Sequence, residues 1–513
     1  MKPTPSARAN VLVLGTEPID EAEFSVRGLK LMPVGLGDFN SALLSDARGV
    51  LISERPGPGS LAAAFFRRHF RDACAAGVTT LVNATGPAVG TANRVRDLAL
   101  ENFGLTDPER AELKMLVEGT SATLAHTLYE HKPGPQIGHP RVELYPRKKT
   151  LAEETKLLLQ RAFWDCEALT LEVLQGGKTA MQTFRASVTL KWTGIAPEPM
   201  PFFVKIGDRR SIAAERRHYK EWAEPFIPFH LRPNLCESRV VCTPGTSALV
   251  CNFVDGATPL RPALRTDQGA GTLFSLFEVT LRGLRIQAMR TSPTKGAVQT
   301  FLSERVRAAE ITARYFDRIA AARELRPSTR APELVEAALK GIAADMWSRR
   351  GIYHGDLHSG NVMVRRHDAI VIDFGSMEDV GPLSADPAFL EVSLAFGTDN
   401  MDSPDSFEEW RRFIDETFLE NSPSEPPLLS LDQFNFVWLR KALREIRHVV
   451  KSCGVSDQEM TVVLCGCLLR FGRLDAFDLS DQKLVALSEK RRAYALVVAD
   501  RLCDRLERHH ATS

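Results

Sequence analysis

The stretch YHGDLHSGNVMVRRHDAIVIDFG, residues 353–375, holds two histidines that flank an aspartate, followed by two short β-branched runs and a further aspartate. The spacing His354-x-Asp356-x-His358 occurs in some metal-dependent hydrolases, and the same letters also fit a loop that transfers a phosphoryl group. A hydrolytic metal site needs further carboxylates or histidines, and the other histidines of the chain stand in no matching motif. The histidine-metal interpretation is therefore disfavoured.

Asp356, Asn361 and Asp373 are the polar residues on which the second interpretation depends. The runs NVMV and AIVID flank the polar turn 365–368 and predict a β-hairpin, which brings Asn361 and Asp373 to one end. An amide oxygen and a carboxylate there suit Mg²⁺, a hard cation that prefers oxygen ligands. Asp356, in the loop before the hairpin, is suited to accept the proton of an attacking hydroxyl. We therefore predict a catalytic aspartate, Asp356, and two metal ligands, Asn361 and Asp373.

A glycine pair upstream is a candidate phosphate-binding loop. The letters GGKT match the end of a P-loop, but Glu172 stands where that motif requires its first glycine, which excludes a P-loop. Two strands, 168–175 and 184–192, are predicted instead, joined by a loop with Gly176 and Gly177 at its base. Backbone N–H groups in such a loop can approach phosphates because no Cβ stands in the way. A plain hairpin turn is the alternative.

The apolar strand PFFVKIG (201–207) is interrupted by Lys205. A buried ammonium group needs an anion, and Glu215, on the helical segment that follows, is a candidate partner. On this interpretation Lys205 holds nucleotide phosphates and Glu215 holds Lys205. The alternative is a lysine at a strand edge whose amine reaches water. The next strand ends near Phe253, where backbone amides of a hinge would face an adenine ring.

The first hundred residues alternate strands and helices. An apolar helical pattern covers 59–77, and strands are predicted at 10–16, 29–35, 49–54 and 79–86. This alternation predicts a small parallel α/β domain, receiver-like or flavodoxin-like, over residues 1–108.

The carboxyl ends of these strands carry few groups for chemistry. The order of elements resembles a response-regulator receiver, but the third strand ends in Glu54 and the first in Gly15-Thr16-Glu17, which leaves too few carboxylates for Mg²⁺. No G-x-G-x-x-G run supports a dinucleotide site. A regulatory, docking or scaffolding role, with a protein as a candidate partner, is therefore expected for this domain.

The motifs HGDLHSGN and IDFG together resemble the catalytic core of aminoglycoside phosphotransferases, choline kinases and their relatives with a protein-kinase-like fold. The upstream segments also resemble the kinase-like domains called ternary-complex-associated in bacterial conflict and signalling systems. The resemblance covers about residues 165–470. It implies a bilobal kinase-like fold, ATP and Mg²⁺ as cofactors, and the roles given above to the residues of the loop, the hairpin and the Lys205–Glu215 pair.

Two differences from regulated protein kinases bear on the acceptor. Protein kinases that are regulated on their activation loop carry Arg before the catalytic Asp, where this chain has Gly355. Only about ten residues separate Gly375 from the helix expected to start near Asp386, which leaves no long segment for docking a peptide. A small-molecule hydroxyl is therefore expected as the acceptor. The glycine pair lacks a regular G-x-G-x-x-G run, which keeps a catalytically weak protein open as an alternative.

The predicted fold class is α/β plus α+β. Its parts are an α/β domain (1–108), a Pro-rich linker (109–149), a kinase-like N-lobe (150–257) that opens with a helix, and a mostly helical C-lobe (258–513).

Composition narrows the class of protein further. Lys plus Arg (65) nearly cancels Asp plus Glu (64), so no basic field favours nucleic acid. No apolar run approaches the roughly 20 residues that a membrane span needs, and no signal peptide is evident. The nine cysteines lack paired C-x-x-C spacing, as expected of a reduced cytoplasmic protein.

The predicted function is that of an Mg-ATP-dependent phosphotransferase with an appended α/β regulatory domain. The alternative is a kinase-like signalling or scaffolding module that binds nucleotide with little turnover.

Overall fold

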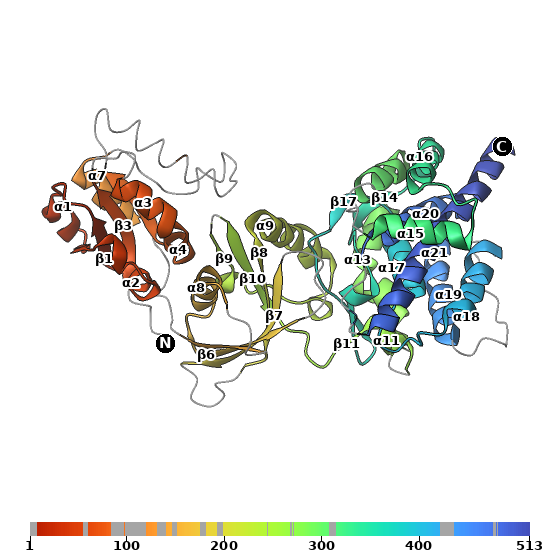
Figure 1. Ribbon diagram of the computed structural model, residues 1–513, viewed down its shortest axis with the longest axis horizontal. Helices are drawn as coiled ribbons and strands as arrows, with labels where there is room; N and C mark the ends of the chain where they lie inside the picture. The colour runs from red at the N-terminus through yellow and green to blue at the C-terminus, as the bar shows by residue number, and fades with distance from the viewer. Residues whose placement is uncertain are drawn as a thin grey trace. The chain divides into compact units, whose positions relative to one another are not determined.

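The computed structural model is a mixed α/β chain (Figure 1). The structure describes residues 8–54, 60–83, 97, 119–130, 140–145, 151–174, 181–191, 199–243, 245–266, 269, 271–306, 314–420, 436–475, 479 and 481–512. Two compact units are present: the first comprises Met1–Ala213 and Leu235–Phe253, and the second comprises Ala214–Asn234 and Val254–Ser513.

A parallel sheet opens the first unit, in the order β2-β1-β3-β4. Its strands are β1 (Asn10–Leu14), β2 (Lys30–Pro33), β3 (Ala47–Ser53) and β4 (Thr79–Asn83). Its helices include α1 (Glu21–Ser25), α2 (Ser41–Asp46), α3 (Leu61–Arg68), α4 (Phe70–Ala75) and α7 (Ser121–Glu130). All four predicted strands are present, and every residue of β3 is buried because helices pack on both faces of the sheet. The single helix predicted over 59–77 is instead α3 and α4, with the break at His69.

The second sheet of this unit has six strands in the order β5-β6-β7-β8-β10-β9. Its strands are β5 (Arg141–Tyr145), β6 (Cys166–Val173), β7 (Gln182–Leu190), β8 (Phe202–Asp208), β9 (Val241–Cys242) and β10 (Thr246–Asn252). β5 and α7 both lie in the stretch predicted as a linker, and β5 pairs in parallel with β6. The helix before β6 is α8 (Glu153–Ala162).

Helices form most of the second unit, as the sequence predicts (Figure 1). Its larger helices are α13 (Arg282–Met289), α15 (Tyr315–Leu325), α16 (Pro332–Ala343), α17 (Ala385–Phe396), α18 (Phe407–Ile414), α19 (Val437–Ser452), α20 (Asp457–Arg473) and α21 (Gln482–Thr512). Shorter helical segments are α11 (Leu260–Leu264), α12 (Thr272–Ser275), α14 (Ala297–Phe301), the π-helical turns η2 (Tyr219–Ala223), η6 (Leu276–Thr280), η7 (Leu302–Val306) and η9 (Asp415–Glu420), and the 3-10 turn η8 (Ser359–Asn361). Helix α9 (Arg209–His218) begins in the first unit and ends in the second.

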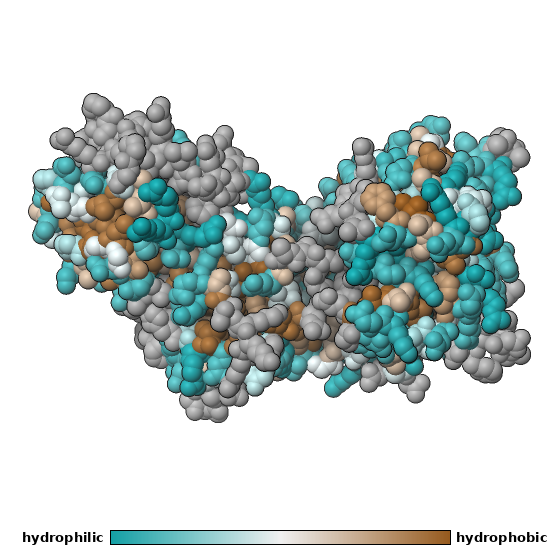
Figure 2. All heavy atoms as spheres, in the orientation of Figure 1, coloured by the Kyte–Doolittle hydropathy of each residue, from teal (hydrophilic) through white to brown (hydrophobic). Residues whose placement is uncertain are grey.

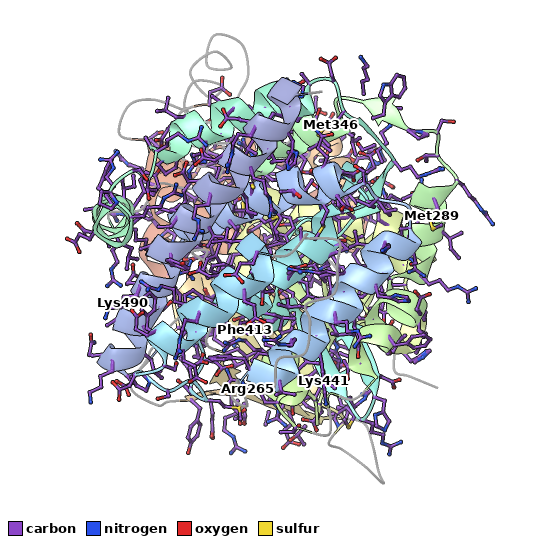
Figure 3. The ribbon with its side chains drawn as sticks, turned by 90° about the vertical axis from the view of Figure 1, so that its right-hand side faces the viewer. Arg265, Met289, Met346, Phe413, Lys441 and Lys490 are labelled. Atoms are coloured by element: carbon purple, nitrogen blue, oxygen red, sulfur yellow. The ribbon has the colours of Figure 1, made fainter. Side chains whose placement is uncertain are left out.

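Helix α20 is the central helix of the second unit. Nearly all of its residues are buried, and it packs against α21 and α17. Figure 3 looks onto these helices: the fully buried Phe413 of α18 lies among them, and the exposed Lys490 of α21 lies at the outer rim. The helical packing therefore supplies a rigid base for the loops that it carries.

Three small sheets connect these helices. β15 (Val362–Arg365) and β16 (Asp368–Val371) form the predicted hairpin, and β11 (Thr258–Pro259) adds to its edge. β12 (Thr294–Lys295) pairs with β13 (Trp347–Ser348), and β14 (Arg350–Tyr353) pairs with β17 (Glu378–Pro382). The last two pairs join segments far apart in sequence, and short-range patterns did not predict them.

The surface of the described residues is ordinary for its composition. On the face drawn in Figure 2, hydrophilic residues predominate and hydrophobic ones form separate patches. In the part of the chain that the structure describes, no helix combines the length and the apolar character needed to cross a membrane.

Candidate active site

Asp386, in the first turn of α17, binds the backbone of the loop that follows β14. The Asp386 carboxylate accepts hydrogen bonds from the backbone N–H groups of His354 (2.8 Å) and Gly355 (3.1 Å). Burial raises the pKa of Asp386, and these donors oppose that rise. Asp386 therefore supports the loop as a structural residue at a helix start.

His354 is buried and connects the loop to the segment after β16. Its Nδ1 accepts a hydrogen bond from the Asp356 N–H (3.4 Å), and its Nε2 lies 3.0 Å from the Ile372 carbonyl oxygen. A carbonyl can only accept, so Nε2 carries the proton in this arrangement. The ring thus fixes Asp356 relative to the residue that precedes Asp373.

The hairpin of β15 and β16 brings Asn361 next to Asp356. The register pairs Val362 with Val371, and the Ile372 N–H donates to the Asn361 carbonyl (3.0 Å). The Asn361 side chain donates from Nδ2 to the Asp356 carbonyl (2.9 Å). These bonds, with those of His354, connect Asp356 and Asn361 to Ile372, the residue that precedes Asp373.

Asp373 has a backbone φ of +61°, in the left-handed region that non-glycine residues seldom adopt. Its side chain is exposed, and its Oδ1 accepts a hydrogen bond from the Gly375 N–H (3.3 Å). A residue held in such a conformation costs free energy, so the surrounding contacts must impose it. Strain of this kind gathers at functional sites, which agrees with a ligand role for Asp373.

Glu215 lies close to this segment within the second unit. A Cβ added at Gly375 would lie 3.4 Å from Asp373 Oδ1 and 3.5 Å from Glu215 Oε2. The end of α9 and the turn after it also pack here, through His218 Nδ1 and the Gly375 carbonyl (3.2 Å). The side chain of Glu215 is buried, with 5% of its surface exposed. The structure therefore brings Glu215 together with the Asp373 segment.

The remaining predicted residues belong to the first unit. Lys205 is on β8, a strand flanked by β7 and β10, and only 6% of its surface is exposed, which disfavours a lysine at a strand edge. Phe253 follows β10; its N–H donates to the Pro201 carbonyl (2.9 Å), and the Arg185 guanidinium lies 5.5 Å from its ring centre. Gly176 and Gly177 lie outside the described residues. Because Lys205 and Glu215 belong to different units, their pairing stays a prediction.

The donor set fits a hard cation. Asn361 uses its amide nitrogen on the Asp356 carbonyl, so its amide oxygen is the atom that a ligand would meet, and Asp373 offers carboxylate oxygens. Mg²⁺ is commonly held by one or two such side chains together with substrate phosphates. Within the described ranges, no group of three or more His, Cys, Asp or Glu residues is arranged to hold a metal ion.

Two arginines at the site escaped prediction from the sequence. Arg470 on α20 forms an ion pair with Asp356, with its Nη2 at 3.2 Å from Oδ1. Arg305 of η7 forms an ion pair with Glu378 (2.7 Å) and donates from Nε to the Tyr353 hydroxyl (3.0 Å). Both come from helices far from the loop in sequence, and arginine in a helix carries no local signal of such a contact.

The local backbone explains why the residue before Asp356 is glycine. Gly355 has φ +77°, and a Cβ there would lie 2.8 Å from Arg305 Nη2 and 2.1 Å from the Ser376 carbonyl oxygen. The Ser376 carbonyl and the left-handed backbone therefore exclude a side chain at 355, and the Arg305 guanidinium adds a second, more adaptable contact.

The comparisons with known proteins point to the families that the motifs resemble. The family model described as "Ternary complex associated domain 9" matches residues 279–449, about a third of the chain, including the loop and hairpin. The chain resembles the aminoglycoside phosphotransferase and choline kinase families, as predicted. No curated protein is significantly similar to it.

Similar solved structures include three whose identity to the chain is low. Aminoglycoside phosphotransferase APH(3'')-Id from Streptomyces rimosus is 16% identical, with a TM-score of 0.32, and the alignment covers 57% of this chain and 99% of that one. A thermostable mutant of APH(4)-Ia in a ternary complex with AMP-PNP and hygromycin B is 13% identical, with a TM-score of 0.38 and coverage of 69% and 98%. A choline/ethanolamine kinase family protein from Mesorhizobium loti is 12% identical, with a TM-score of 0.32 and coverage of 66% and 92%.

Proposed function

We propose that the protein is a Mg-ATP-dependent phosphotransferase whose acceptor is a small-molecule hydroxyl. The observation that carries the proposal is the bonded loop and hairpin: Asn361 donates to the Asp356 carbonyl, and His354 connects Asp356 to Ile372, next to the left-handed backbone of Asp373. In this proposal Asp356 is the general base, and Asn361 and Asp373 hold the cation.

The chain's own residues account for the proton chemistry of this reaction. Asp356 accepts the proton of the acceptor hydroxyl, and His354 fixes the backbone of Asp356 through Nδ1. MgATP, when bound, supplies the phosphoryl group, whose bond to ADP breaks as its bond to the acceptor oxygen forms. Lys205 anchors the phosphates, Glu215 holds Lys205, the Gly176–Gly177 loop covers the phosphates, and Phe253 marks the adenine side.

The short segment between Gly375 and α17 supports a small-molecule acceptor over a peptide. Helix α17 begins at Ala385, ten residues after Gly375, so the intervening segment is short. Gly355 stands directly before Asp356, where protein kinases regulated on their activation loop carry an arginine that binds the phosphorylated loop. We further propose a bilobal kinase-like arrangement, with a receiver-like α/β domain over residues 1–108 that regulates it or docks a protein partner.

The test is ADP production from MgATP with a panel of alcohols and sugars, for the wild type and Asp356→Asn. A general base contributes about 10²–10⁴-fold to the rate, so the variant should lose that much ADP production for the best acceptor. Asp356→Asn keeps the size of the side chain, so the variant should still fold and should still show a thermal shift with MgATP.

Two results would count against the proposal. If the wild type makes no more ADP than Asp356→Asn while MgATP still raises its melting temperature, the protein is a nucleotide-binding module with little turnover. If MgATP produces neither ADP nor a thermal shift, the nucleotide site itself is wrong.

A further inference from the structure

The carboxylate of Asp356 is held by a cation from a distant helix. Arg470 of α20 donates from Nη2 to Asp356 Oδ1 at 3.2 Å and from Nη1 to the Arg305 carbonyl at 3.1 Å. The side chain of Arg470 is 17% exposed and that of Asp356 is 32% exposed. The pair is therefore partly shielded from water, where a charge-assisted hydrogen bond is stronger and more directional than on an open surface.

Arg470 is itself fixed in place. Its guanidinium lies 5.4 Å from the ring centre of Phe389 on α17, and Phe389 packs edge-on against Phe301 of α14 at 5.7 Å. With its second nitrogen bonded to the Arg305 carbonyl, the guanidinium has few alternative orientations. A side chain ordered in this way loses little further entropy when it orients the carboxylate.

The two oxygens of Asp356 have different surroundings. Oδ1 receives Arg470, and Oδ2 lies 3.9 Å from Nε2 of His358. The His358 Nδ1 accepts the Gly360 N–H at 3.1 Å, so a neutral ring carries its proton on Nε2, facing Oδ2. Because Arg470 bonds Oδ1, the carboxylate cannot rotate freely, and Oδ2 stays on the side of His358.

We infer that Arg470 is a positioning residue for the base: by bonding Oδ1, it fixes the orientation in which the Asp356 carboxylate accepts the proton of the acceptor hydroxyl. This inference rests on the proposed function. Since Arg470 acts through Asp356, it should affect turnover and leave nucleotide binding unchanged.

The test compares Arg470→Met, Arg470→Lys and a matched control, Arg285→Met, with the wild type. Arg285 of α13 pairs with Glu278 and is similarly buried, since the two side chains are 15% and 31% exposed, and its ion pair is with Glu278 and not with Asp356. Turnover is measured as ADP production from MgATP with the acceptor that gives the wild type its highest rate. The KM for MgATP and the melting temperature are recorded for every variant.

Misplacing a reacting group by about 1 Å can cost about 100-fold, so kcat of Arg470→Met should fall roughly 10- to 100-fold while the KM for MgATP stays within about twofold. Arg470→Lys should recover part of the loss, because lysine keeps the charge and loses the planar fork. Arg285→Met should keep the wild-type kcat to within about twofold and should lower the melting temperature as much as Arg470→Met does.

Three outcomes would overturn the inference. In the first, Arg470→Met turns over like Arg285→Met, so the ion pair only stabilises the fold. In the second, the loss appears in the KM for MgATP, so Arg470 acts on nucleotide binding. In the third, the wild type makes no ADP with any acceptor. The proposed function then fails together with the inference, and the wild-type measurement alone distinguishes this outcome from the first two.

Discussion

Glu459 is a buried carboxyl group whose charge depends on pH within an ordinary range. It lies in the first turn of α20, is 4% exposed, and accepts a hydrogen bond from the Ser384 hydroxyl at 2.7 Å. Burial raises the pKa of Glu459 from 4.5 to about 6, and the Ser384 hydrogen bond only partly opposes the rise. Between pH 4.5 and about 6, Glu459 therefore stays largely protonated in the folded protein while it is largely ionised in the unfolded chain.

The sign of the effect on stability follows from this difference. Between pH 4.5 and about 6 the folded state binds more protons than the unfolded state, so raising the pH lowers the free energy of unfolding. The loss from this group is on the order of 2 kcal/mol and is complete above the folded-state pKa. Glu459→Gln, which cannot ionise and can still accept from Ser384, removes this contribution.

We predict that between pH 4.5 and 7 the wild type loses about 2 kcal/mol more stability than Glu459→Gln, as measured by urea unfolding at several pH values. Glu408→Gln serves as the control, because the Glu408 side chain is 67% exposed. Equal pH slopes for the wild type and Glu459→Gln would show that Glu459 is already ionised in the folded protein at low pH.

At the scale of elements, α8 belongs to two hydrophobic cores of the first unit. Leu157 packs in the core of the parallel sheet, and Leu158, Leu159 and Ala162 pack in the core of the six-stranded sheet. Arg161 adds a polar tie, since its buried guanidinium donates to the Ala75 carbonyl at 2.7 Å near the end of α4. One helix thus joins two sheets that the sequence suggested were separated by a linker.

We predict that this shared helix makes the two sheets unfold together. Leu157→Ala and Leu158→Ala each remove a fully buried side chain of α8, one from each core, and each should cost about 2–5 kcal/mol. If the sheets are coupled, each substitution should speed amide hydrogen exchange in both β3 and β7 by at least about 30-fold, the factor that corresponds to 2 kcal/mol. Exchange that rises only in β3 for Leu157→Ala and only in β7 for Leu158→Ala would show two independent folding units.

At the scale of the whole chain, a feature can be predicted from the sequence when the residues that form it lie close together along the chain. The hairpin and the grouping of Asp356, Asn361 and Asp373 were predictable because all of their information lies within 23 consecutive residues. The pairing of β14 with β17 and the contact of Arg470 with Asp356 were not, because they depend on helices that bring together residues as many as 114 positions apart. The strained φ of Asp373 also escaped, since only the packed surroundings impose it.

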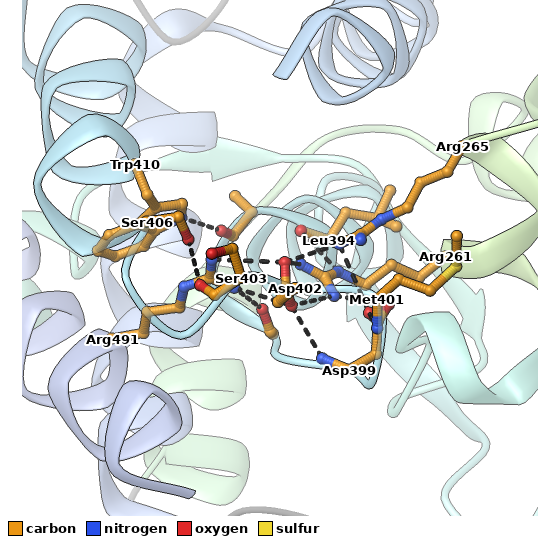
Figure 4. A network of polar contacts seen from close by, with 12 residues as sticks. Arg261, Arg265, Leu394, Asp399, Met401, Asp402, Ser403, Ser406, Trp410 and Arg491 are labelled. Atoms are coloured by element: carbon orange, nitrogen blue, oxygen red, sulfur yellow. Dashed lines mark hydrogen bonds and ion pairs between the residues drawn. The ribbon is translucent and has the colours of Figure 1, made fainter. Parts of the chain in front are cut away.

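A charged network that joins three distant segments of the second unit was likewise not predictable from the sequence (Figure 4). Asp402 accepts hydrogen bonds from Arg261 (2.8 Å), Arg265 (2.7 Å) and Arg491 (3.2 Å), and its side chain is 5% exposed. The nearby guanidinium groups outweigh burial and hold the pKa of Asp402 well below its usual range. Through this residue α11, the segment after α17 and the C-terminal helix α21 are connected.

We predict that Asp402→Asn destabilises the second unit far more than Asp399→Asn. The first change leaves the fully buried Arg491 without its carboxylate partner, which costs about 3–5 kcal/mol, or roughly 5–15 °C in melting temperature. Asp399 is 22% exposed and contacts Arg261 and Arg265 from the rim, so its loss should cost about 1 kcal/mol or less. Thermal unfolding followed by circular dichroism measures both variants, and similar melting temperatures for the two would mean that Asp402 does not link α21 to the rest of the unit.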